Sequence, residues 1–184
     1  MQVCLRSPGA SNDTLGTPDE LLKHATGGVA QVFRYWDRKR GDRDMPSSDD
    51  IDFLELRAWL PGIMLVEVMQ SSPRDLVYRV VGERAVRQRG YDPSGMSVRH
   101  AAYGHSVDDA LETYGTVVDR RLPLYCWDEP QAVAGQVSST LALPLSRDGQ
   151  SVDRVLVYGE DHAAAQTAGV GAGTAANAKR ARLD

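Results

Sequence analysis

The first regular pattern of apolar and polar positions along the chain is helical. Between Thr17 and Gly41 the apolar residues recur at spacings of three and four, which places them on one helix face. They are Leu22, Ala25, Val29, Val32, Phe33 and Trp36. Thr17-Pro18-Asp19-Glu20 forms a capping box with proline at the first helical position, and Gly41 suits the helix end. Gly27-Gly28 interrupts the pattern, so the helix either bends there or begins after it.

Two strands follow, and three more close the pattern. Residues 63–68 and 76–81 are apolar runs rich in β-formers, separated by a loop that contains Pro73, which predicts a hairpin. The later strands are expected at 124–128, 137–145 and 153–158. Within 137–145 apolar residues alternate strictly with smaller or polar ones, as in a sheet with two unequal faces. Asp148-Gly149 supplies the turn chemistry between the last two strands.

The segment between the second and third strands is helical. Residues 83–89 predict a short helix ended by Gly90, and Ser106 begins an amphipathic helix that ends near Pro123. The order contains no strand-helix-strand repeat, which argues against a doubly wound parallel sheet. We therefore expect an α+β fold in which a five-stranded antiparallel sheet carries a helical crossover on one face and an N-terminal helix.

Composition divides the chain into four segments. Residues 1–16 are expected to be disordered, and 17–60 to form an N-terminal helical extension with a second helical piece at 52–59. Residues 61–162 are expected to form the folded domain itself. The tail 163–184 is mostly small residues ending in a basic cluster, and it has too few large apolar groups to offset its ordering entropy.

The overall composition narrows the class of protein. The 184 residues are 42% hydrophobic, enough for one domain with a core, and the net charge of -4 argues against a nucleic-acid partner. Cys4 and Cys126 are far apart in the sequence, so neither a zinc site nor a disulfide framework is indicated. No apolar run approaches the ~20 residues that span a bilayer, and no signal peptide is evident. We expect a cytoplasmic protein without a membrane partner.

Several short motifs occur in order between about residues 30 and 160. They are Tyr35-Trp36, Met45-Pro46-Ser47-Ser48-Asp49-Asp50-Ile51-Asp52, Leu60-Pro61, Tyr78-Arg79-Val80-Val81-Gly82, Gly90-Tyr91-Asp92-Pro93-Ser94-Gly95, and Leu141-Ala142-Leu143-Pro144-Leu145-Ser146 followed by Asp148-Gly149. With the strand order, they resemble a PAS-like family common in alphaproteobacteria. The resemblance implies a bacterial sensory or regulatory domain in signal transduction, often standing alone. The chain departs from the family pattern at Ser48, Phe53 and Met96, so a binding role is not carried over to those positions.

The resemblance also bears on cofactors. PAS domains that bind flavin covalently carry the reactive cysteine in the helical crossover, whereas residues 83–121 contain none and Cys126 falls on a strand. Some PAS domains hold haem through a crossover histidine, a role open to His100 and His105, although a surface or core histidine is the simpler interpretation. The cofactor therefore stays unknown. The aspartates between residues 49 and 52 lack calcium-loop spacing and fit helix capping, so we expect no metal site.

The expected ligand-binding residues lie on elements that bracket the space between sheet and crossover. Tyr78, Tyr114, Tyr125 and Trp127 offer aromatic surface with polar tips, although core packing is the simpler interpretation. Arg99 and His100 offer donors to an anionic ligand. We predict a ligand site of Tyr78, Arg99, His100, Tyr114 and Trp127.

Three functions are compatible with these features. The first is a sensor that binds a small molecule or a signalling protein. The second is a ligand-free interaction module that forms a homodimer through the helix of residues 17–40, because an amphipathic helix must bury its stripe on its own sheet or on another chain. The third, an enzyme, is not expected, since no spacing nominates catalytic residues.

Overall fold

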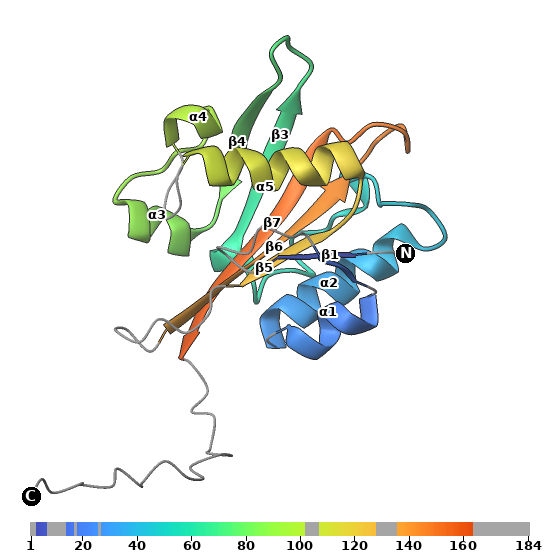
Figure 1. Ribbon diagram of the computed structural model, residues 1–184. Coiled ribbons are helices and arrows are strands. Elements are labelled where there is room, and N and C mark those ends of the chain that lie inside the picture. The colour runs from blue at the N-terminus through green and yellow to red at the C-terminus, as the bar shows by residue number, and fades with distance from the viewer. Residues whose placement is uncertain are drawn as a thin grey trace, which may run out of the picture.

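The computed structural model describes residues 3–6, 14–16, 18–25, 27–101, 107–127 and 136–163. The expected five strands form one antiparallel array in the order β5-β6-β7-β3-β4 (Figure 1). Their bounds are Ile63–Met69 (β3), Asp75–Val81 (β4), Leu124–Trp127 (β5), Gln136–Leu145 (β6) and Arg154–Ala163 (β7). The predicted α+β, PAS-like fold is confirmed, and the hairpin, the crossover and the three-stranded meander follow the expected order.

Two short strands extend this array beyond β5. Val3–Arg6 (β1) pairs parallel with β5, and Thr14–Gly16 (β2) pairs antiparallel with β1. Both fall in residues 1–16, where the composition favoured disorder, because strand addition uses backbone N–H and C=O groups that every sequence carries. The rest of that segment, and nearly all of the tail 163–184, lie outside the described residues, so the predicted domain boundaries stay a prediction.

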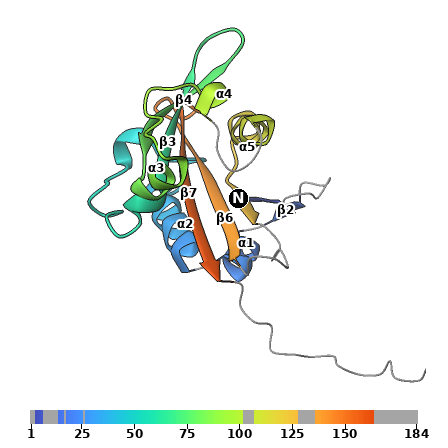
Figure 2. The ribbon, with the colours of Figure 1, turned by 90° about the vertical axis from the view of Figure 1, so that its left-hand side faces the viewer.

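Helices cover both faces of the sheet. Pro18–His24 (α1) and Gly27–Arg40 (α2) lie on one face, and Val107–Arg120 (α5) lies on the other (Figure 2). The helical pattern at the N-terminus is thus divided into two helices, and the second begins at the glycine pair. The crossover also contains the expected Glu83–Arg89 (α3) and a further turn of helix, Val98–Ala101 (α4).

The apolar stripe of α2 is buried on the chain's own sheet. Val29, Val32, Phe33 and Trp36 are at most 1% exposed. The Trp36 indole Nε1 donates to the carbonyl of Pro144 on β6 at 2.9 Å. The stripe therefore needs no second chain to leave water, which removes the argument from amphipathicity for a dimer through this helix.

The prediction of a helix at 52–59 is wrong, because the segment is a series of turns. Two short 3-10 helices, Ser48–Asp50 (η1) and Leu60–Gly62 (η2), flank it. Leu56 is its one fully buried side chain, and so short a segment has too little packing to offset helix nucleation. Asp50 does serve as a cap, since its carboxylate accepts from the Ser47 N–H at the start of η1 at 2.8 Å, whereas Asp52 accepts from the Leu54 N–H at 2.8 Å within a turn.

Gly82 forms the corner between β4 and α3. Its amide donates to the carbonyl of Ile63 at 2.7 Å, and its backbone lies directly against Leu60 and Pro61 of η2. Glycine is needed for this close approach, not for its φ of -66°, which any residue adopts. The corner sets where α3 leaves the sheet and therefore where its last residue, Arg89, can reach.

Candidate functional site

Two of the predicted site residues, Tyr78 and Tyr114, meet between the sheet and the crossover. Tyr78 lies on β4 and is 1% exposed, and Tyr114 lies on α5 and is 6% exposed. The Tyr114 hydroxyl donates to that of Tyr78. Buried tyrosines place aromatic surface in the core but need a partner for the hydroxyl. Here each hydroxyl supplies that partner, which leaves a polar centre in an otherwise apolar layer.

Arg89 from the last turn of α3 joins this pair. Its Nη2 donates to the Tyr78 hydroxyl at 3.3 Å, and its guanidinium carbon lies 5.0 Å from the centre of the Tyr78 ring. Its Nη1 lies 3.8 Å from the Met64 sulfur on β3. A guanidinium over a tyrosine ring is a favourable cation–π arrangement. We name Tyr78, Tyr114 and Arg89 the tyrosine–arginine cluster.

Both tyrosines stay neutral over the ordinary pH range. Burial raises the pKa of Tyr114 well above that of free tyrosine, and the neighbouring Tyr78 adds to the effect. Burial also raises the pKa of Tyr78, although the positive charge of Arg89 opposes the shift. Their hydroxyls can therefore donate and accept hydrogen bonds but do not supply negative charge, and the formal charge of the cluster comes from Arg89.

The turn after α3 fixes the position of Tyr78. Gly90 ends the helix at a φ of 77°, as its place in the sequence predicted. The chain then returns to the edge of β4, where Gly95 donates to the Tyr78 carbonyl at 2.7 Å and the Tyr78 amide donates to Met96 at 3.0 Å. The edge strand is thus covered at Tyr78, which holds its side chain under the crossover.

The other predicted site residues are not brought to this cluster. Arg99 and His100 lie on α4 with exposed side chains, and within the described ranges no side-chain hydrogen bond or ion pair links them to the tyrosines. Trp127 ends β5, and its side chain lies outside the described residues. Tyr125 faces α2 rather than the crossover, because it pairs with Leu141, Leu141 pairs with Tyr158, and the Tyr158 hydroxyl lies against Gly28 of α2.

Arg89 was missed by the sequence analysis. A basic residue in the last turn of a helix is expected from the helix dipole alone, so its presence there carries no further signal. That it turns back over a strand tyrosine depends on the Gly82 corner, which is a tertiary feature. The one indication in the sequence was that Arg89 ends a short helix that directly follows the strand carrying Tyr78.

Cysteine, histidine and acidic residues were the candidates for holding a cofactor or a metal. Cys126 is half-buried on β5 and lies outside the crossover, and His105 and Ser106 are not among the described residues. In the described part of the chain, no three His, Cys, Asp or Glu residues gather as metal ligands would. Nor does any helix there have the length and apolar character to cross a membrane.

Comparison with known proteins identifies the family. No curated protein and no solved structure matches the chain. The PAS domain family does match it, over residues 23–158, a range that includes α2, the five-stranded array up to Tyr158 and the whole crossover. PAS domains generally serve sensory or regulatory roles in signal transduction. The chain belongs to the PAS domain family.

Proposed function

We propose that this PAS domain is a signalling sensor whose small-molecule ligand binds at the tyrosine–arginine cluster. The observation that carries the proposal is the polar centre formed by Tyr78, Tyr114 and Arg89 between sheet and crossover. Ligand sites are mostly apolar with a few convergent polar groups, and this layer has that character. Arg99 and His100 belong to the proposal as residues that a ligand or partner contacts at its periphery, whereas Trp127, two positions from Tyr125 on β5, stays a sequence prediction.

The ligand would orient against hydroxyls that are already in place. The Tyr78 hydroxyl accepts from both Tyr114 and Arg89, so its own O–H can donate to an incoming acceptor, and an incoming donor finds the lone pairs of Tyr114. The Arg89 guanidinium supplies further donors. Since these groups bind and polarise but none is a nucleophile or a general base near neutral pH, we infer binding rather than catalysis.

Native mass spectrometry of the purified full chain tests the proposal. The expected result is a mass above that of the polypeptide, or one that appears when a metabolite library is added. Tyr114→Phe should weaken this binding by about tenfold through the lost hydroxyl, whereas Tyr125→Phe, a buried tyrosine on the other face, should leave it unchanged. Polypeptide mass alone throughout would refute the proposal, as would equal losses in both variants.

The alternative is a ligand-free interaction module that forms a homodimer or binds a signalling protein. The α2 stripe is covered by the chain's own sheet, so such a partner would use another surface. Deleting the helices would expose that sheet face and is a poor test. Light scattering on the full chain over a hundredfold concentration range is better, and a constant monomer mass would exclude the homodimer.

We further infer a bacterial, cytoplasmic setting and no nucleic-acid or membrane partner. The resemblance to alphaproteobacterial PAS-like proteins and the net charge of -4 support this inference. Fractionation of cells that express the tagged chain tests the location, and recovery in the membrane pellet would contradict it.

A further inference from the structure

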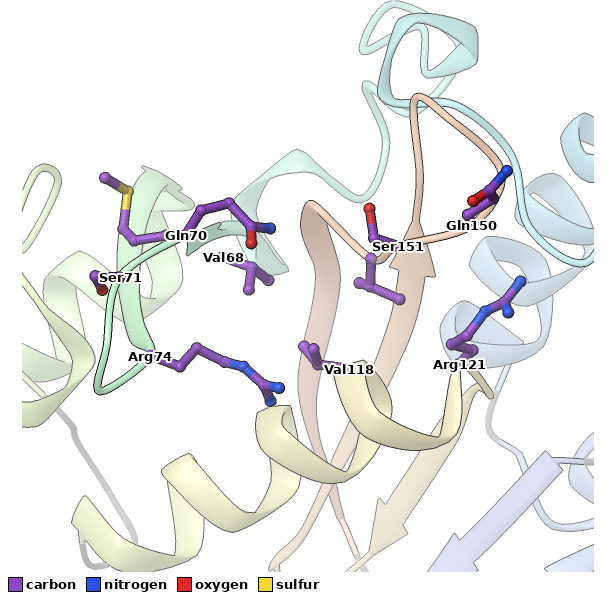
Figure 3. Close-up of a pocket in the computed structure, with 10 residues that line it drawn as sticks. Val68, Gln70, Ser71, Arg74, Val118, Arg121, Gln150 and Ser151 are labelled. Carbon is purple, nitrogen blue, oxygen red and sulfur yellow. The ribbon is translucent and has the colours of Figure 1, made fainter.

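A second feature lies apart from the tyrosine–arginine cluster. A trough of about 380 Å³ opens between the β3–β4 hairpin, the last turn of α5 and the β6–β7 turn (Figure 3). Its apolar lining includes Val68, Val118 and Val152. None of the residues that line it belongs to the cluster. The volume is within the ~300–1,000 Å³ range of small-molecule sites.

Among the described residues that line the trough, two are arginines and none is acidic. Arg74 comes from the hairpin loop and Arg121 from the residue after α5, and Figure 3 shows Val118 between them. The amide side chains of Gln70 and Gln150 add neutral polar groups at the rim. The lining therefore presents positive charge on either side of an apolar centre.

The carboxylates that pair with these arginines lie outside the lining. Arg74 Nη1 is 2.7 Å from Asp119, whose side chain is 64% exposed, and Arg121 Nη2 is 3.1 Å from Asp44, which is 76% exposed. Solvent-exposed ion pairs contribute little stability. A second carboxylate or another oxyanion can therefore replace either partner at low cost.

Arg121 has a further unused donor. It follows α5 directly, with a φ of 56°, and its Nη2 also donates to the carbonyl of Gly149 at 3.1 Å. Its Nε is buried and has no acceptor among the residues that the structure describes. Buried N–H groups without an acceptor are rare, and a ligand oxygen is one way to satisfy such a group.

We propose that the trough binds an elongated organic dianion with an oxyanionic group at each end and an apolar middle. One end pairs with Arg74, the other with Arg121, and the middle lies on Val118. Guanidinium forks suit carboxylate and phosphate oxygens, and the valines suit a methylene chain. This site is additional to the ligand proposed for the tyrosine–arginine cluster and does not depend on it.

Calorimetric titration of the full chain with linear α,ω-dicarboxylates, from succinate to sebacate, tests the proposal. Because two fixed cations select a span, affinity should reach a maximum at one chain length, and the monocarboxylate of that length should bind about tenfold more weakly. Pyrophosphate, which has two charged ends without an apolar middle, should bind more weakly than the best dicarboxylate. Affinity without length dependence, or strongest for pyrophosphate, would overturn the proposal.

Charge variants separate this site from general anion attraction. Arg74→Gln should weaken the binding of the best dicarboxylate by about tenfold. Asp119→Asn removes the competing carboxylate and should strengthen that binding about threefold. Glu55→Gln is the matched control, because it makes the same change in net charge and releases Arg38 and Lys39, neither of which lines the trough. If Glu55→Gln increased the affinity for the dicarboxylate as much as Asp119→Asn does, no specific site would exist.

Discussion

The corner at Gly82 allows a prediction whose size follows from distances. A Cβ placed on Gly82 would lie 2.5 Å from the carbonyl oxygens of Leu60 and Pro61 and 2.7 Å from the Pro61 carbonyl carbon. All three atoms are backbone, so no side-chain rotation relieves the overlap. The φ of -66° and ψ of 151° suit alanine, so the cost of Gly82→Ala is steric rather than conformational.

Overpacking of this kind costs about 1–3 kcal/mol, and the rigid neighbours place Gly82→Ala near about 3 kcal/mol. For a chain of this size, that loss should lower the melting temperature by roughly 6–12 °C. Gly115→Ala is the matched control. It lies inside α5 with no atom of the described residues within 4 Å of the new methyl group, so helix propensity should stabilise it by up to about 1 kcal/mol.

Urea unfolding followed by circular dichroism measures both changes. The free energy of unfolding should fall for Gly82→Ala and rise for Gly115→Ala, with little change in the denaturant slope. A Gly82→Ala protein as stable as the wild type would refute the reasoning, because η2 would then have to move away from the corner without cost.

Three other measurements test the N-terminal helices and their contacts with the sheet. Gly28→Ala should destabilise, because the new methyl group would clash with the Tyr158 hydroxyl and the Glu160 carboxylate, whereas Gly27→Ala meets open space among the described residues and should stabilise by up to about 1 kcal/mol in urea unfolding; the reverse order would contradict the packing. Trp36→Phe removes the donor to Pro144 and should cost about 1–3 kcal/mol by the same assay, and no loss would show that the bond is dispensable. Burial, with the hydrogen bond to Glu160, raises the pKa of Tyr158 to about 12, so above pH 10 the unfolded state binds fewer protons than the folded state and stability should decline between about pH 10 and 12. Tyr158→Phe should lessen that decline, and an unchanged pH profile would count against this reasoning.

The strands and main helices were predictable because their side-chain periods are local. Leu141 and Leu143 alternate with Ala142 and Pro144 in the sequence, and the same alternation separates the two faces of β6. What periodicity cannot state is which face meets which helix. Tyr125 was therefore expected to border the space between sheet and crossover, whereas its pairing with Leu141, and through it with Tyr158, places it on the face that meets α2.

The site was less predictable because its parts come from segments that no local pattern connects. Tyr78 and Tyr114 were identified from their elements, but Arg89 reaches them only because Gly82 lets α3 pack against η2. The trough is harder still, since hairpin, helix end and turn meet only in the folded chain. The helix predicted at 52–59 was wrong for the opposite reason, because a local helical pattern existed without the packing to support it.

Helix α5 connects the cluster to the trough, and this connection leads to a last prediction. Tyr114 lies in the middle of α5, and Arg121 directly follows its last residue, seven residues later and so roughly 10 Å away. Val117, between them, is fully buried on the sheet and holds the helix in place. The middle of α5 and the residue after it should therefore act independently, and the changes in the free energy of unfolding for Tyr114→Phe and Asp44→Asn should add within about 0.5 kcal/mol in a double-mutant cycle. A coupling above about 1 kcal/mol would show instead that α5 shifts as one body, so that a ligand at one site would alter affinity at the other.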